Sequence, residues 1–376
     1  MQFQNIENNQ SNEAENKINS LLQFAVNQKA SDLHLAVGRH PTVRIDGSLI
    51  PLEQEIVLTP EVTVSIANFL MSERNKSEFK KDGHTDFSYS LENLARFRVN
   101  VFSQKGHTGI VMRVINSEIK RLEDLGISDI VYNFANFSQG LFLVTGPVGS
   151  GKSTTLAALI DYINHNQTQN IITIEDPIEY IYTPDKSIVN QREIGQDTFT
   201  FQSALRAALR EDTNVILIGE MRDLETISTA ITAAETGHLI FGTLHTNDSA
   251  QTVDRIIDMF PSHQQNQVRS QLSSILLGVM SQRLIPRIDG GRVPAAEIMI
   301  KNHAIENLIR EGKTYQIDTV IETGQKEGMI SLDKALAELV QSGVISEEQM
   351  MIYAKNREYA QMLSKGGVQE SIQIDE

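Results

Sequence analysis

Cysteine is absent from this 376-residue sequence. Without thiols the chain forms no disulfide, carries no cysteine nucleophile and builds no zinc site from thiolates. Histidine and carboxylate side chains remain available as metal ligands. Any metal chemistry therefore has to go through these groups.

Long apolar runs are absent as well. No window approaches the roughly 18 uninterrupted apolar residues that indicate a transmembrane helix. The amino-terminal stretch MQFQNIENNQSNEAENK is polar and acidic, and it has none of the apolar core of a secretory signal. We therefore expect a cytoplasmic protein without a transmembrane segment, which would reach a membrane only through a partner.

Basic residues are in the minority. The chain has 33 lysines and arginines against 48 aspartates and glutamates, which gives a formal charge of −15. Such a surface repels the phosphates of nucleic acids at long range, although a local basic patch is compatible with it. The charge disfavours a nucleic-acid partner.

The first part of the chain mixes helical and extended patterns. Residues 1–16 are rich in Asn, Gln and Glu, which is typical of a disordered terminus. Apolar residues at helical spacing begin at Ile18, and alternating strand patterns cover residues 95–104 and 107–115. We expect a smaller α+β domain over residues 17–115.

After a polar linker at residues 116–125, the pattern changes. Apolar strand segments now alternate with helical ones, and the strand segments are GLFLVTG (140–146), IITIED (171–176), VILIGE (215–220) and LIFGTLH (239–245). This alternation predicts an α/β domain over residues 126–360, with a mostly parallel sheet flanked by helices. From Pro261 onward the chain is expected to be mainly helical, and residues 361–376 are expected to form a disordered acidic tail.

A phosphate-binding motif stands between an expected strand and an expected helix. GPVGSGKS matches G-x-x-x-x-G-K-[ST], and with the next threonine the predicted binding residues are Gly146, Pro147, Val148, Gly149, Ser150, Gly151, Lys152, Ser153 and Thr154. Glycines let the backbone turn its N–H groups toward phosphate, Lys152 reaches the β- and γ-phosphates, and the Ser153 hydroxyl binds Mg²⁺. A chance glycine-rich turn is the alternative, but the strand before it and the helix after it favour a site for ATP and Mg²⁺.

Acidic residues follow two of the expected strands. Glu175, Asp176 and Glu179 come after IITI, and Glu220 comes after VILIG. Ligands of open α/β sheets lie beyond the carboxyl ends of the strands, and ATP hydrolysis needs carboxylates that orient water and hold the water shell of the metal. Glu220 suits the positioning of water, and Glu175 or Glu220 could hold Mg²⁺ through water. The alternative is that such acids only cap a following helix.

Histidines and arginines offer further candidates. His238 and His245 lie at opposite ends of the strand LIFGT, so they are not expected to share a metal. Either could be a buried hydrogen-bonding group only, but His245, at the carboxyl end, is better placed to sense the γ-phosphate. The candidates for neutralising phosphate charge are Arg96, Arg98, Arg113, Arg206, Arg210 and Arg222. Strand arginines are often only solvated, so the residues alone leave this choice open.

Together these motifs resemble those of the type II/type IV secretion ATPase superfamily. They comprise the Walker A loop, the Asp box TIEDPIEY (173–180), the Walker B segment VILIGEMRD (215–223) and the His box TGHLIFGTLHT (236–246). Three more segments resemble the PilT-type retraction ATPases of type IV pili, and these are ASDLHL (30–35), RFRVNVFSQKG (96–106) and AIENLIREGK (304–313). The last motif usually has Arg where this chain has Glu306, so no role that needs a positive charge there carries over. The resemblance covers roughly residues 17 to 360.

This resemblance implies an architecture and partners. It implies a C-terminal RecA-like P-loop ATPase domain with a smaller N-terminal PAS-like domain, assembled as a homohexameric motor. The motor would power pilus retraction and twitching motility through an inner-membrane pilus platform protein, alone or with a paralogous retraction ATPase. The chain would then be cytoplasmic and peripheral at the inner membrane.

The resemblance also implies roles for single residues. Glu220 would be the catalytic carboxylate, with Glu175 and Asp176 assisting at the metal and the water. Arg98 and Arg113 would help to neutralise the phosphates, with Arg96 as an alternate. His245 would couple the state of the γ-phosphate to domain movement.

Two other functions remain open from the sequence. One is a sister ATPase for pilus extension or type II secretion, although many of those carry a tetracysteine zinc module that a chain without cysteine cannot form. The other is a nonhydrolysing regulatory partner of the retraction motor, which an intact Glu220 disfavours.

Overall fold

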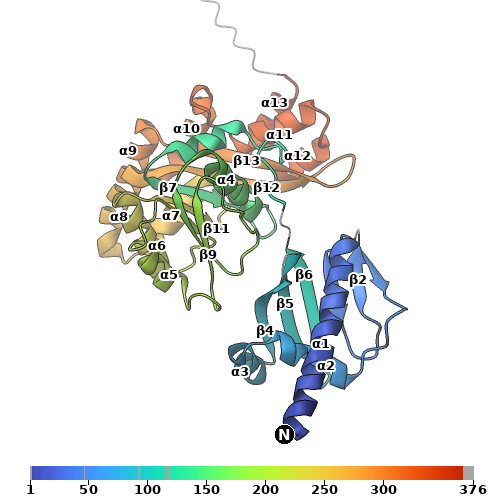
Figure 1. Ribbon diagram of the computed structural model, residues 1–376. Coiled ribbons are helices and arrows are strands. Elements are labelled where there is room, and N and C mark those ends of the chain that lie inside the picture. Colours follow the sequence, from blue (N-terminus) through green and yellow to red (C-terminus); the bar gives the residue numbers. More distant parts are fainter. Residues whose placement is uncertain (1, 46, 92–93, 116–117, 367–376) are drawn as a thin grey trace, which may run out of the picture. The chain divides into compact units, whose positions relative to one another are not determined.

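The computed structural model describes residues 2–45, 47–91, 94–115 and 118–366 (Figure 1). Within it the chain forms two compact units, and each is considered by itself. Unit 1 comprises residues 1–118 together with 177–181, and unit 2 comprises residues 119–176 and 182–376. The boundary at residue 118 falls inside the expected linker, of which residues 116–117 lie outside the described part.

Unit 1 is a sheet with helices. Its elements are α1 (Gln2–Asn27), β1 (Asp32–Leu35), β2 (Thr42–Ile45), β3 (Ser48–Pro51), α2 (Pro60–Leu70), α3 (Glu73–Asp82), β4 (His84–Leu91), β5 (Ala95–Gln104) and β6 (His107–Ile115). The six-stranded sheet has the order β3-β2-β1-β6-β5-β4, and every neighbouring pair is antiparallel. The segments expected at residues 95–104 and 107–115 coincide with β5 and β6.

The start of the chain differs from the expectation. Residues 1–16 are expected to be disordered, but α1 begins at Gln2 and continues to Asn27. Polar residues do not stop a helix, and no Gly or Pro interrupts this stretch. Ile18 and Leu22, which have no exposed surface, bury one face of the helix in the core of unit 1. That burial holds the helix to which the polar residues belong.

Unit 2 is an α/β structure. Its elements up to the end of the central strands are the 3₁₀ helix η1 (Asp129–Asn136), β7 (Gly140–Thr145), α4 (Lys152–Asn166), β8 (Asn170–Glu175), β9 (Ile188–Glu193), α5 (Phe201–Ala208), β10 (Val215–Ile218), α6 (Leu224–Glu235) and β11 (Leu239–Leu244). The seven-stranded sheet has the order β13-β12-β7-β11-β10-β8-β9. Each pair of neighbouring strands from β12 to β9 is parallel. The expected parallel sheet is confirmed, because β7, β8, β10 and β11 are the four predicted strands.

The remaining elements of unit 2 correct one expectation. They are α7 (Ser249–Asp258), α8 (Ser262–Ile275), β12 (Leu276–Pro286), β13 (Arg292–Ile300), α9 (His303–Glu311), η2 (Thr314–Gln316), α10 (Ile317–Thr323), η3 (Gly324–Glu327), α11 (Leu332–Gln341), α12 (Glu347–Tyr353) and α13 (Arg357–Ser364). The prediction of mainly helical structure after Pro261 is wrong for β12 and β13. Their apolar runs are too short for periodicity to separate a strand from a buried helix, and β12 becomes a strand by pairing with β7.

The described end of the chain is helical. Residues 361–376 are expected to form a disordered tail, but α13 continues to Ser364, and Ala360 is fully buried in a small core with α11. Residues 367–376 lie outside the described part. Among the described residues, no helix is both long and apolar enough to cross a lipid bilayer.

Candidate functional site

The predicted phosphate loop connects the end of β7 to the start of α4. Gly146, Gly149 and Gly151 all have positive φ, at 139°, 76° and 90°, which favours glycine at each position. Gly151 precedes the first residue of α4, and no side chain caps this helix. Its first backbone N–H groups are therefore available to an anion, in the position where P-loops bind phosphate.

Gln282 braces this loop from the neighbouring strand β12. Its Nε2 donates to the carbonyl oxygen of Ser150 at 2.8 Å, and its Oε1 accepts from the Thr155 hydroxyl at 2.7 Å. The Gln282 side chain is buried, and a Cβ at Gly151 would lie 2.8 Å from its Nε2. The amide therefore fixes the loop and the first turn of α4 together. Sequence reasoning missed Gln282, because its segment was expected to be helical.

Lys152 lies over the loop that it follows. Its Nζ donates to the carbonyl oxygens of Gly146 at 2.8 Å and Pro147 at 3.0 Å. The same Nζ lies 3.5 Å from Nδ1 of His245. The structure thus brings the predicted lysine and the predicted histidine together at the carboxyl edge of the sheet.

His245 also reaches the Walker B glutamate. Its Nε2 lies 2.8 Å from Oε1 of Glu220. An ammonium group only donates, so Nδ1 of His245 acts as the acceptor toward Lys152, and this leaves the proton on Nε2 to be donated to Glu220. His238, at the other end of β11, instead contacts the carbonyl oxygen of Ala233. The imidazole of His245 therefore bridges Lys152 at the phosphate loop and Glu220 at the end of β10.

Glu220 is held as a carboxylate. Burial by itself would raise its pKa, but the hydrogen bond and charge of Arg222, together with His245, outweigh burial and hold the pKa below its ordinary value. Arg222, one of several arginine candidates in the sequence, contacts this glutamate. The nearby charge of Asp176 helps to raise the pKa of Arg222, after the larger effect of Glu220 itself. Glu220 is therefore an anion at neutral pH.

Glu175 lies at the end of the adjacent strand. It is 8% exposed, and its Oε1 accepts from the Thr173 hydroxyl at 2.6 Å and from Nε2 of Gln191 at 3.4 Å. Between the two acids Gly219 packs closely, since a Cβ there would lie 3.3 Å from Cα of Glu175. Glu175 and Glu220 are thus neighbours across β8 and β10, as their strand-end positions predict.

The arginines that the resemblance assigns to the phosphates, Arg98 and Arg113, lie in unit 1. Arg98 on β5 is directly opposite Arg113 on β6, and Arg113 is in turn opposite Asp32 on β1. Nε of Arg113 lies 2.9 Å from the Asp32 carboxylate, whereas Nε of Arg98 lies 3.9 Å from Asp86. Burial opposes ionisation of Asp32, but hydrogen bonds from Ser31 and Arg113 hold its pKa below the usual value. The role of Arg98 and Arg113 toward a nucleotide stays a prediction.

Glu179 and Glu306 are two further positions that the sequence singled out. Glu179 belongs to the segment 177–181, which clusters with unit 1 rather than with the phosphate loop. Glu306, at the unusual position of its motif, forms an ion pair with Arg310 one turn later in α9. Its carboxylate therefore serves a contact within the helix.

A phosphate loop between a parallel strand and a helix, facing a strand-end glutamate and a histidine, defines a P-loop ATPase. The chain belongs to the family described as "Type II/IV secretion system protein", which it matches over residues 7–373. Together with the relatives described next, this membership confirms that the protein is an ATPase that binds nucleotide.

Two relatives and one solved structure are similar over most of the chain. The "Type IV pilus retractation ATPase PilT" of Pseudomonas aeruginosa is 49% identical over 343 residues, which cover 90% of this chain and 98% of that protein. A "Twitching motility protein" of Neisseria gonorrhoeae is 47% identical over 85% of both chains. The crystal structure of "the Pilus Retraction Motor PilT and Bound ADP" superposes with a TM-score of 0.85 at 47% identity, covering 91% of this chain and 98% of the other. This likeness confirms the expected fold.

Proposed function

We propose that this chain is the motor ATPase that powers retraction of type IV pili and thereby twitching motility. The observation that carries the proposal is the contact of His245 with both Lys152 and Glu220, because it links the phosphate loop to the glutamate proposed for hydrolysis. The similarity to a retraction ATPase along 98% of its length supports the choice of process.

The residues of the loop bind and orient the triphosphate. The backbone N–H groups of residues 146–154 surround the phosphates, and Lys152 exchanges its loop carbonyls for the β- and γ-oxygens. The Ser153 hydroxyl, with Glu175 and Glu220 through water, would hold Mg²⁺, which neutralises phosphate charge when bound. Oxygen donors of this kind fit a small hard cation.

Glu220 carries the hydrolytic step. As a carboxylate it orients a water molecule toward the γ-phosphorus and takes up its proton, while Glu175 and Asp176 assist at the metal and the water. His245 senses the γ-phosphate, because the loss of that group changes what Lys152 contacts. Arg98 and Arg113, with Arg96 as an alternate, neutralise the phosphates.

The same proposal covers assembly and partners. The chain acts as a homohexamer on an inner-membrane pilus platform protein, alone or with a paralogous retraction ATPase. It is cytoplasmic and peripheral at the inner membrane, and nucleic acid is not a partner, in keeping with the charge of −15.

A deletion strain and the purified protein test the proposal together. We expect Mg²⁺-dependent ATP hydrolysis that DNA does not stimulate, and cells without the protein should be hyperpiliated and nonmotile. Loss of surface pili would instead indicate a pilus-extension or type II secretion ATPase. A purified wild-type protein without hydrolysis would indicate a regulatory partner of the motor.

A further inference from the structure

The connection between α12 and α13 is held by one buried carboxylate. Asp333, in the first turn of α11, accepts from the backbone N–H of Lys355 at 2.7 Å and from that of Asn356 at 2.9 Å. Its side chain uses both carboxylate oxygens in this way, and Asp333 is 4% exposed. This capture fixes the backbone at Lys355, and therefore the direction in which its side chain leaves the chain.

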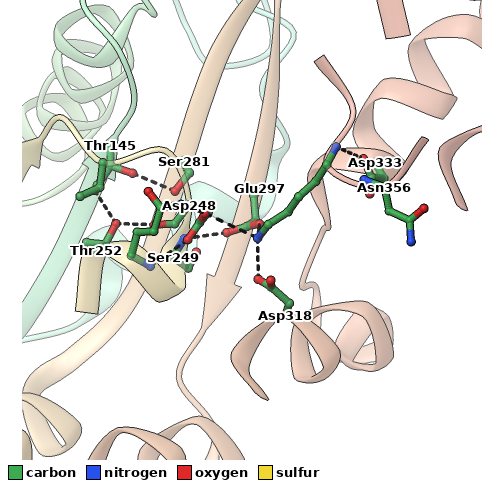
Figure 2. A network of polar contacts seen from close by, with 12 residues as sticks. Thr145, Asp248, Ser249, Thr252, Ser281, Glu297, Asp318, Asp333 and Asn356 are labelled. Atoms are coloured by element: carbon green, nitrogen blue, oxygen red, sulfur yellow. Dashed lines mark hydrogen bonds and ion pairs between the residues drawn. The ribbon is translucent and has the colours of Figure 1, made fainter. Parts of the chain in front are cut away.

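The Lys355 ammonium enters a group of three carboxylates from three other elements. Its Nζ lies 2.7 Å from Asp318 on α10, 3.7 Å from Asp248 at the start of α7 and 3.7 Å from Glu297 on β13. Figure 2 shows the dashed contacts converging between these labelled acids. One lysine thus connects the C-terminal helices to α7, β13 and α10.

The charges of Lys355 and Glu297 depend on one another, because burial opposes both of them. Burial raises the pKa of Glu297 despite the nearby lysine, and its Oε1 accepts from the backbone N–H of Ser249 at 2.8 Å. Burial would lower the pKa of Lys355, but the surrounding carboxylates outweigh it and raise the pKa instead. Removing the cation would leave buried acids without a counter-charge, which strongly destabilises their present arrangement.

The acids that Lys355 contacts lie next to the ATPase site. Asp248 caps α7 by accepting from the backbone N–H of Gln251 at 2.8 Å, and only two residues separate it from His245. In the same segment the hydroxyls of Thr246 and Thr252 lie 2.7 Å apart. The segment from His245 to Asp248 is therefore held at one end by Glu220 and at the other by Lys355.

A second connection runs through the sheet. Glu297 is directly opposite Ser281 on β12, and the Ser281 hydroxyl lies 2.8 Å from that of Thr145. Thr145 is the last residue of β7 before the phosphate loop (Figure 2). The acid that Lys355 neutralises is thus also in register with the base of the loop.

We propose that Lys355 is a positioning residue of the ATPase site, which fixes the start of α7 through Asp248 and Glu297 and so sets where His245 faces Glu220 and Lys152. The inference rests on the role proposed for His245. It makes hydrolysis depend on α11, α12 and α13, because Asp333 of α11 fixes the connection from which Lys355 extends.

Steady-state kinetics on the full chain test this assignment. We expect Lys355→Met to lower kcat about tenfold while KM for ATP and the affinity for a fluorescent ADP analogue stay within about twofold, because the phosphate loop itself is unchanged. Lys355→Arg should restore part of kcat, since it keeps the cation. Lys334→Met is the matched control, because Lys334 on α11 contacts Gln325 and Glu338 and none of these acids.

A double mutant separates this inference from the proposed function. If Lys355 acts through His245, Lys355→Met in a His245→Ala background should lower kcat no further. Multiplying effects, or an unchanged kcat in Lys355→Met alone, would overturn the role of Lys355 and leave that of His245 standing. An unchanged kcat in His245→Ala would overturn both.

A milder variant serves if Lys355→Met does not fold. Asp318→Asn keeps the cation but removes the acid closest to Nζ, so that Lys355 is held less firmly against Asp248 and Glu297. We expect a kcat several-fold below wild type with nucleotide affinity kept. A wild-type kcat, or a loss of nucleotide affinity in proportion to kcat, would contradict the assignment.

Discussion

His245 donates to Glu220 across 2.8 Å while its other ring nitrogen faces Lys152 at 3.5 Å. The glutamate follows β10, the histidine follows β11 and the lysine opens α4, so the contact exists only because the parallel strands end at one edge. In this arrangement a change at the lysine reaches the Glu220 carboxylate through a single side chain. The predictions below concern the groups around this contact.

Replacing the carboxylate itself should separate binding from hydrolysis. Glu220→Gln keeps the size of the side chain but removes the negative charge that we propose orients and deprotonates water, so we expect kcat to fall by at least about a hundredfold. Affinity for a fluorescent ATP analogue should stay near that of the wild type. Glu225→Gln, at an exposed position in the first turn of α6, is the control. Substantial turnover in Glu220→Gln would remove Glu220 from the mechanism.

The acid limb of the pH profile should depend on Arg222. This arginine helps to hold the pKa of Glu220 below its ordinary value, so the carboxylate stays ionised at lower pH than a free glutamate. In Arg222→Gln the pKa of Glu220 rises, and kcat should begin to fall at a higher pH as the medium is acidified. Profiles of kcat against pH for the wild type, Arg222→Gln and the exposed control Arg255→Gln measure the shift. Superimposable acid limbs would show that Arg222 does not tune Glu220.

Gln282, which holds the phosphate loop, should contribute both to the stability of the fold and to the affinity for nucleotide. Gln282→Ala leaves the Ser150 carbonyl and the Thr155 hydroxyl without their buried partner, which should lower the free energy of unfolding by about 1–3 kcal/mol. Because the loop is then less well fixed, affinity for ATP should fall as well. Thermal unfolding and titration with a fluorescent ATP analogue measure the two effects. Full affinity in Gln282→Ala would show that the loop keeps its shape unaided.

A Cβ added at Gly151 tests the same packing from the other side. Gly151→Ala requires a non-glycine residue at φ 90° and places a methyl group 2.8 Å from Nε2 of Gln282, so nucleotide binding should be lost. Gly343→Ala is the matched control, because it has φ 69° and no heavy atom within 4 Å of the added Cβ. Both variants carry backbone strain, but only the first displaces the brace. Equal nucleotide affinity in the two variants would argue against a role for this packing.

The arginines of unit 1 can be tested by kinetics. If Arg98 neutralises phosphate charge, Arg98→Ala should raise KM for ATP several-fold and lower kcat/KM further than Arg44→Ala does. Arg44 is a suitable control because it lies in the same sheet and pairs with Asp32 at 3.8 Å. Equal kinetics in the two variants would show that Arg98 is only a solvated strand residue.

The local sequence pattern was sufficient to predict the phosphate loop and the four central strands. The loop motif requires glycine at positions whose φ is positive in the structure, so the motif by itself predicts the conformation of the loop. Strands β7 and β11 are buried on both faces, and in the sequence they are therefore continuous apolar runs bounded by turns. Glu175 and Glu220 were predicted as site residues for the same reason, since strand ends mark the binding edge of a parallel sheet.

Tertiary structure decided the groups whose partners are distant in sequence. Gln282 meets the phosphate loop because β12 pairs with β7, and short apolar runs do not predict such pairing. Lys355 meets acids from α7, β13 and α10, which are brought together only by the tertiary structure. Polar composition likewise did not reveal that α1 extends back to Gln2, because a helix is held by the face it buries and not by the residues it exposes. The sequence by itself therefore determined the chemistry of the site, whereas long-range packing decided which side chains hold that chemistry in place.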